Sequence, residues 1–110
     1  MSWQNIVRQL DHAIREGFTI RPFTLDVFSD VEILIPGSYF CNASSGPIAV
    51  NIPPGDSLDG YIINIKKMDP TGNKVVVTST EGIDGLQEIE ICLQYENLQI
   101  QFHDGRWHIL

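Results

Sequence analysis

The stretch Glu88–His103, EIEICLQYENLQIQFH, decides the fold class of this chain. Apolar and polar residues alternate along it, and a period of two is typical of a β-strand with one buried face. The alternation restarts at Leu98, so the stretch predicts two strands. Asp104-Gly105 follows directly and predicts a tight hairpin turn, after which residues 106–110 return as a further strand.

The same pattern continues toward the N-terminus, as short apolar or alternating runs between turn residues. The predicted strands cover residues 48–52, 61–67 and 74–80, and Pro- and Gly-containing turns separate them. Together these elements predict about six short antiparallel strands that form a small β-sandwich or barrel-like domain. Residues 39–110 are therefore assigned to a β-rich domain.

Residues 1–38 have a different character. Ser2 is a suitable N-cap, apolar residues recur at helical spacing, and Gly17 provides a stop, so one short N-terminal α-helix is expected. From Phe18 to Ile35 the apolar positions suggest an extended arm or one to two strands.

An isolated helix of this length is marginal in water, so it needs a surface to lie on. That surface is its own domain, a symmetry-related copy or another protein. The apolar residues expected to make attachment or oligomer contacts are Trp3, Ile6, Val7, Leu10, Ile14, Phe18, Ile20 and Phe23.

Composition excludes several classes of function. The 110 residues carry a net charge of -7, a poor match for nucleic acid, whose affinity depends on Lys and Arg. No stretch approaches the roughly 18 apolar residues of a membrane span, and no signal peptide is visible. Folding in a reducing cytoplasm is expected, with Cys41 and Cys92 as free, buried thiols.

Catalysis has little support in the sequence. His103 and His108 flank the Asp104-Gly105 turn and could sit close together, but no third metal ligand stands at a fixed local spacing. The aspartates fall at predicted turns, where their side chains bond to nearby amides. We therefore expect no enzyme activity, no cofactor and no metal. The aromatic residues Trp107, Tyr95 and Phe102 could form a carbohydrate-stacking platform, although core packing is the favoured interpretation.

The order of turns and strands from Tyr39 to Leu110 resembles a domain of bacteriophage fibre and head-decoration proteins. The resemblance rests on a series of short motifs, in chain order Gly46-Pro47-Ile48-Ala49-Val50, Ile52-Pro53-Pro54, Gly60-Tyr61-Ile62-Ile63-Asn64-Ile65-Lys66-Lys67, Asp69, Asn73-Lys74-Val75-Val76-Val77, Ile83-Asp84-Gly85, Gln94-Tyr95-Glu96-Asn97-Leu98 and Asp104-Gly105-Arg106-Trp107-His108-Ile109. No single motif is specific, and the similarity lies in their order over about two thirds of the chain.

The resemblance implies a homotrimeric structural protein of the virion, made in the host cytoplasm. No long shaft sequence is present, which favours a capsid decoration (cement) protein or short head fibre that binds the major capsid protein or another virion protein. Residues 1–38 would attach it. The alternatives are a tail-fibre or tail-tip module and, from another class, a small carbohydrate-binding β domain.

Overall fold

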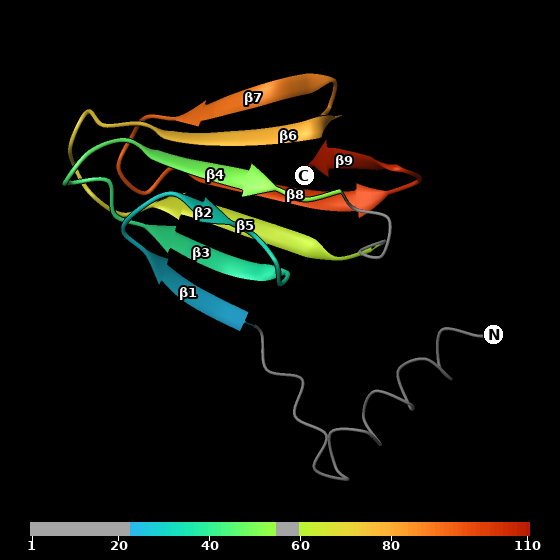
Figure 1. The fold of residues 1–110 in the computed structure, drawn as a ribbon, viewed down its shortest axis with the longest axis horizontal. Helices are drawn as coiled ribbons and strands as arrows, with labels where there is room; N and C mark the ends of the chain where they lie inside the picture. The colour runs from blue at the N-terminus through green and yellow to red at the C-terminus, as the bar shows by residue number, and fades with distance from the viewer. Residues whose placement is uncertain (1–22, 55–59) are drawn as a thin grey trace, which may run out of the picture.

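Nine β-strands form one continuous sheet in the computed structural model of the protein, which describes residues 23–54 and 60–110 (Figure 1). The described part contains no helix, so the predicted all-β character of this region is confirmed. The strands in chain order are β1 (Phe23–Val27), β2 (Val31–Glu32), β3 (Gly37–Cys41), β4 (Ile48–Ile52), β5 (Ile62–Lys67), β6 (Val75–Ile83), β7 (Leu86–Ile91), β8 (Asn97–His103) and β9 (Arg106–Ile109).

The first six strands alternate between two parallel rows. Row A consists of β1, β3 and β5, and row B of β2, β4 and β6, with each strand parallel to its neighbours in the row. The chain therefore winds like a short solenoid, passing from row A to row B and back in each coil. The first coil, residues 23–36, contains β1 and β2.

The last strands join the two rows along one side. The sheet order is β1-β3-β5-β8-β9-β6-β4-β2, so β8 and β9 bridge from β5 to β6, and β7 forms a hairpin on β6. The result is a flattened, barrel-like sheet that is nearly closed. At the opposite side, β1 and β2 are the two ends of the strand order and do not pair with each other (Figure 1).

The expectation of an antiparallel domain is wrong for most of the sheet. Five of the eight strand pairings among the described residues are parallel and three are antiparallel. Alternation of apolar residues specifies which face of a strand is buried and carries no information on strand direction. Parallel neighbours such as β3 and β5 also lie far apart in sequence, where no hairpin turn indicates the pairing.

The core consists of apolar columns that run across the strands. One column on row A stacks Leu25, Tyr39, Ile65 and Leu98 in successive strands. The matching column on row B contains Val31, Val50, Val77 and Ile89. The middle members of both columns are fully buried, which explains why the sequence needs an apolar residue at every second position of each strand.

Most of the N-terminal prediction lies outside the described residues. This is true of the expected helix, of Phe18 and Ile20, and of the part of the arm that precedes Phe23. The stretch expected to be an arm or one to two strands supplies β1 and β2 to the sheet. Within the part of the chain that the structure describes, no helix is long and apolar enough to cross a membrane.

Candidate interaction surface

The core is only partly covered where the sheet fails to close. Leu25 on β1 ends the row A column, and its side chain is 41% exposed, whereas its neighbour Tyr39 in the same column is 2% exposed. Val31, which ends the row B column, is also only partly buried. Both columns therefore end in apolar side chains that the described residues cover only in part.

Three more apolar side chains of the first coil are exposed to solvent. Phe28 follows β1 and is 67% exposed, and Leu34 and Ile35 follow β2 and are 75% and 50% exposed. Phe28 lies at the end of β1, and Leu34 and Ile35 lie near its start, where Phe23 pairs with Gly37. Exposed single apolar residues are common, but several within one coil beside an unclosed sheet indicate a candidate interaction site. We call Leu25, Phe28, Leu34 and Ile35, together with the free edges of β1 and β2, the open edge.

The backbone of the open edge is held firmly in place from inside the domain. The Tyr39 hydroxyl donates a short hydrogen bond to the carbonyl of Ile35, and the Ile33 amide donates to the carbonyl of Asn51 at 2.9 Å. The Phe23 ring packs on the Tyr39 ring with centroids 5.9 Å apart. Burial raises the pKa of Tyr39, so its hydroxyl stays a donor at neutral pH. The exposed side chains are thus carried on an ordered frame.

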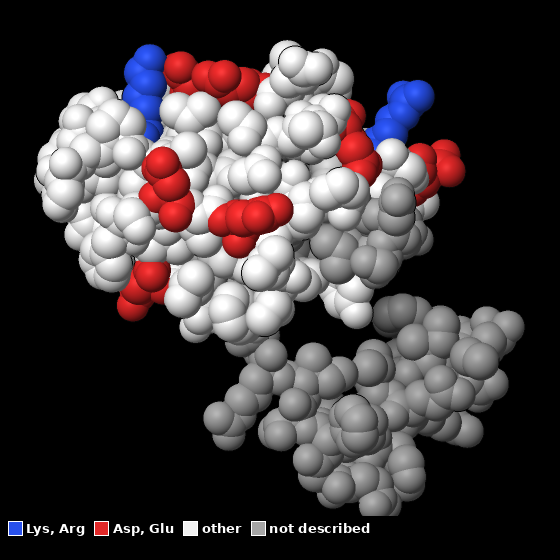
Figure 2. Space-filling model, viewed as in Figure 1, with Lys and Arg blue, Asp and Glu red and all other residues white. Residues whose placement is uncertain are grey.

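The charges of the first coil all have one sign. Residues 23–36 contain Asp26, Asp30 and Glu32 but no Lys or Arg. Asp30 has a structural role, because its Oδ1 accepts a hydrogen bond of 2.8 Å from the Ala49 amide. Acidic side chains are also spread over the face of the molecule that Figure 2 shows. A partner for the open edge should therefore be apolar and should not be acidic.

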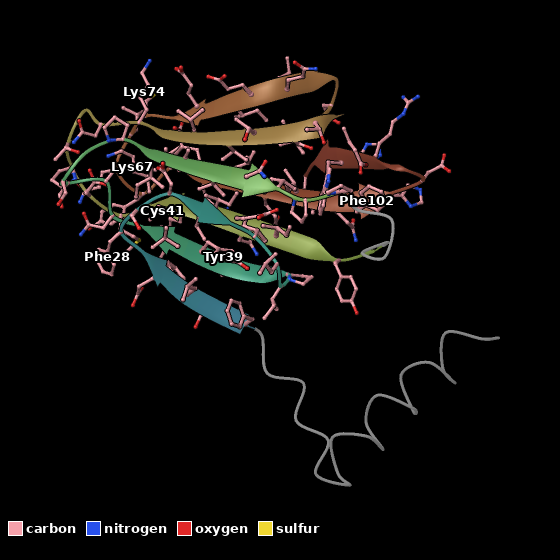
Figure 3. The ribbon with its side chains drawn as sticks, viewed as in Figure 1. Phe28, Tyr39, Cys41, Lys67, Lys74 and Phe102 are labelled. Carbon is pink, nitrogen blue, oxygen red and sulfur yellow. The ribbon has the colours of Figure 1, made fainter. Side chains whose placement is uncertain are left out.

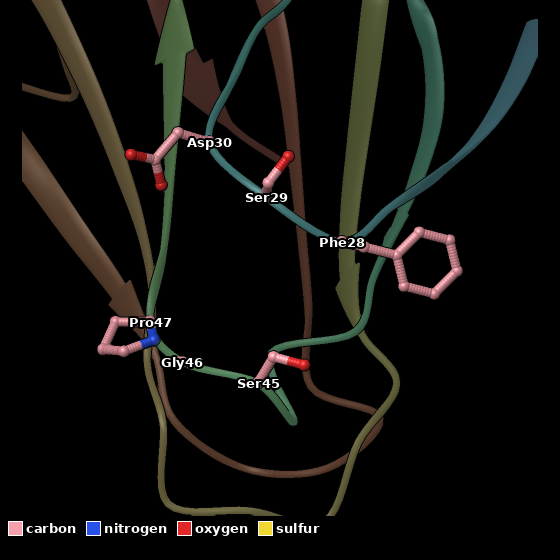
Figure 4. A pocket seen from close by; sticks show the side chains of 6 residues that line it. All are labelled: Phe28, Ser29, Asp30, Ser45, Gly46 and Pro47. Atoms are coloured by element: carbon pink, nitrogen blue, oxygen red, sulfur yellow. The ribbon is translucent and has the colours of Figure 1, made fainter.

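A shallow hollow lies beside Phe28, between the turn that follows β1 and the turn that precedes β4. Its volume is about 360 Å³, and it is lined by Phe28, Ser29, Asp30, Ser45, Gly46 and Pro47. The Phe28 ring points away from the other labelled residues (Figure 4). The hollow contains no His, Cys or Lys, and its one carboxylate is already bonded to the Ala49 amide. It lies beside the open edge and shares Phe28 with it.

A buried ion pair, not predicted in the sequence analysis, lies near the same end of the sheet. Lys67 occupies a core position, and its Nζ donates hydrogen bonds of 2.8 Å to Asp69 Oδ2 and to the carbonyls of Asp69 and Thr71. Asp69 Oδ1 accepts from the Ala43 amide at 2.7 Å. Lys67 extends the column of Val27 and Cys41 in the strand register. Figure 3 labels Cys41 and Lys67. Because Lys67 stands at an inward position of the alternating pattern, that pattern could have identified it as a buried lysine.

Every polar atom of this pair has a partner, so we assign it a structural role. Burial would raise the pKa of Asp69, but the hydrogen bonds from Lys67, Thr71 and the Ala43 amide outweigh burial and hold that pKa well below its usual range. The pair ties the turn after β3 to the turn after β5. A titrating group poised for catalysis would need a pKa near neutrality, and this carboxylate stays charged.

The histidine pair predicted from the hairpin does form. The ring centroids of His103 and His108 lie 6.1 Å apart, and His108 Nδ1 is 3.6 Å from Asp84 Oδ1. Among residues 23–54 and 60–110, no group of three or more His, Cys, Asp or Glu residues is arranged to hold a metal ion. The Asp84 carboxylate also accepts from the Ile109 amide at 3.1 Å, which is consistent with a role in the hairpin.

The three aromatic residues considered as a sugar platform do not share a surface. Trp107 and Phe102 are buried and pack edge to face with centroids 5.1 Å apart. Tyr95 is exposed, and Lys66 Nζ lies 5.4 Å from the centroid of its ring. Core packing, the favoured interpretation, is thus confirmed for Trp107 and Phe102.

The prediction of two buried thiols is wrong for one of them. Cys41 is buried and free, but Cys92 is free and exposed. Cys92 follows the last residue of β7, and its amide donates to Glu96 Oε1 at 2.9 Å. It alternates with Ile91 and falls on the same side as Glu88 and Glu90, so the alternation indicated exposure, whereas the prediction of burial rested on the general tendency of free cysteines to be buried.

Of the eight residues predicted to contact a partner, the structure describes only Phe23. It opens β1 and packs on Tyr39, so its ring contributes to the frame behind the open edge. Trp3, Ile6, Val7, Leu10, Ile14, Phe18 and Ile20 lie outside the described residues. The open edge itself was missed, because Leu25, Leu34 and Ile35 look like ordinary strand residues unless the missing neighbour strand is known.

Comparison with known proteins adds no family. Neither a scan against protein-family models nor a search of curated proteins found a match to this chain.

Proposed function

We propose that this chain is a non-catalytic assembly protein of a bacteriophage particle. In this proposal it acts as a homotrimer and binds the capsid as a decoration (cement) protein or short head fibre. The open edge is the observation that carries the proposal, since exposed apolar side chains beside unpaired strand edges are typical of a surface that binds a partner. The resemblance of residues 39–110 to phage fibre and head-decoration domains supplies the class of particle.

The chemistry of the described surface supports binding over catalysis. The hollow beside Phe28 holds one carboxylate that is already bonded, and the buried Lys67–Asp69 pair is fully partnered. The exposed apolar side chains stand on a backbone that hydrogen bonds hold in place. Such a preformed apolar surface loses little entropy when it is covered. Burial of these side chains between virion subunits would raise the stability of the particle.

The mass of the protein in solution and its attachment to phage particles test the proposal. Light scattering on the full-length protein should give three times the chain mass. Leu34→Asp should reduce attachment to particles, whereas Leu93→Asp should leave it unchanged, because Leu93 is also exposed (68%) but follows β7, away from the first coil. A particle that carries the chain should contain hundreds of copies if the chain decorates the capsid, and very few if it belongs to the tail tip.

Two outcomes would contradict the proposal. The first is a monomer at all concentrations that is retained specifically on a glycan array, which would identify a carbohydrate-binding domain. The second is a Leu34→Asp variant that attaches to particles as well as the unmodified chain does.

A further inference from the structure

Tyr95 combines a strained backbone with an exposed aromatic ring. It has a φ of 66°, its side chain is 59% exposed, and it is the third residue of a turn that the Glu96 amide closes by donating to the Leu93 carbonyl at 3.1 Å. A positive φ at this position of a turn favours Gly or Asn, and a bulky residue is strained there. The other described non-glycine residues with positive φ are Asp84 and Asp104, and Asp tolerates this conformation. The geometry of the turn therefore does not explain why a tyrosine stands at its third position.

The turn that carries Tyr95 is fixed to the end of β5. The Tyr95 amide donates to the Lys67 carbonyl at 2.7 Å, and the side-chain amide of Gln94 donates to the Met68 carbonyl at 3.2 Å. Lys67 is itself anchored by its buried ion pair with Asp69. The backbone that presents the Tyr95 ring is thus ordered before any ligand arrives, so little conformational entropy is lost on binding.

A polar hollow of about 260 Å³ lies beside this ring on the outer face of row A. Lys66 connects the two, because it lines the hollow and its Nζ lies 5.4 Å from the centroid of the Tyr95 ring. In the strand register Ser38 is beside Asn64, and Lys66 is beside Asn97. The residues that line the hollow are Ser38, Tyr39, Phe40, Asn64, Lys66 and Asn97.

The chemistry of the hollow fits a sugar. Asn64 Nδ2 donates one long hydrogen bond, of 3.4 Å, to Ser38 Oγ, and Asn97 is exposed. A carboxamide has two donors and two acceptor sites, and the Lys66 ammonium has three donors. The lining residues include no carboxylate, although the chain carries a net charge of -7. Such donors and acceptors bind sugar hydroxyls, and an aromatic ring beside them packs on the apolar face of a sugar ring.

We propose that Tyr95 and this hollow bind a saccharide, with one sugar ring stacked on the tyrosine and its hydroxyls bonded to Asn64, Lys66 and Asn97. This inference goes beyond the proposed function, because it concerns a surface on β3, β5 and β8 that is separate from the open edge. It uses only one of the three aromatic residues considered in the sequence as a sugar platform.

An array of neutral and acidic oligosaccharides, probed with the full-length protein, tests whether the site binds sugar. The protein should be retained on a subset of them. Titration with the best-retained oligosaccharide should shift amide signals in ¹H–¹⁵N spectra at residues 38–40, 64–66 and 95–97. Retention on no oligosaccharide, or shifts centred on the open edge, would overturn the inference.

Tyr95→Asn separates binding from folding. Because Asn tolerates a positive φ, this variant should unfold at a higher temperature than the unmodified chain. Its affinity for the oligosaccharide should nevertheless fall about tenfold or more, since the stacking ring is lost. Tyr61→Asn is the control and should bind normally, because Tyr61 is also exposed (52%) but precedes β5, at the opposite end of this strand from Lys66.

A second variant tests the polar side of the site. Asn97→Ala should also weaken binding, because it removes the amide and keeps the backbone pairing of Asn97 with Lys66. Unchanged affinity in Tyr95→Asn, or an equal loss in Tyr61→Asn, would overturn the inference. Failure to form trimers or to attach to particles would refute the proposed function and leave these results intact, because a monomer also contains the whole site.

Discussion

The ammonium group of Lys67 lies 2.8 Å from Asp69 Oδ2 in the interior of the sheet, where the two side chains are 0% and 2% exposed. Lys67 ends the column of Val27 and Cys41 on row A, so a lysine occupies the place of an apolar residue. Its three hydrogen bonds and those of Asp69 give both charged groups partners within the protein. Loss of either partner leaves an uncompensated charge in the core.

Asp69→Asn should lower the free energy of unfolding by about 3–5 kcal/mol, the usual cost of breaking a buried ion pair. Glu90→Gln is the matched control: it breaks the Lys74–Glu90 pair, whose atoms are also close at 2.9 Å but whose side chains are about half exposed. That control should cost less than ~1 kcal/mol. Urea unfolding measures both, and equal losses would refute the structural role of the buried pair.

The same carboxylate should make stability sensitive to acid. The pKa of Asp69 in the folded protein lies well below its usual range, so protons bind more readily to the unfolded chain. The stabilisation is fully present above the ordinary pKa of about 3.9 and decreases as the pH falls below it, toward the folded pKa. Thermal melts from pH 7 to pH 2 should show the difference between the native chain and Asp69→Asn narrowing below about pH 4.

The two thiols should react at very different rates. Burial, with the nearby Asp69 carboxylate, raises the pKa of Cys41 to about 11, so little thiolate forms at neutral pH. Cys92 is exposed to reagent. Titration with Ellman's reagent at pH 8 should detect one thiol in the folded protein and two after unfolding. Cys92→Ser should abolish the native signal, whereas two fast thiols in the folded chain would disprove the burial of Cys41.

Gly37 should tolerate no side chain, because β1 lies too close to it. A Cβ at this position would be 2.2 Å from the Phe23 carbonyl oxygen, a backbone atom that cannot move without shifting β1. Gly37→Ala should therefore loosen the first coil and increase hydrogen exchange of the β1 amides. Gly72→Ala is the control, since no atom lies within 4 Å of the corresponding Cβ. Similar exchange in both variants would contradict the close approach of β1 to β3.

The sequence predicted the elements of this fold better than their arrangement. Period-two alternation located most strands after Ser38, and the Asp104-Gly105 turn correctly indicated the hairpin between β8 and β9. The parallel rows were missed, because β4 pairs with β6 at a distance of 27 residues and no local signal marks such a pairing. The same limit hid the open edge, since Leu25 looks like any inward strand residue until its missing neighbour is known.

The order of strands has a consequence for folding during synthesis. Strands β8 and β9 are translated after β6, yet they lie between β5 and β6 in the sheet. While the ribosome is still making residues 97–109, the two rows have no strand that joins them across this side. Such long-range closure is slow, because the loop entropy is lost before the contacts form. The nascent chain should therefore stay susceptible to proteases and available to chaperones until β9 has emerged from the exit tunnel.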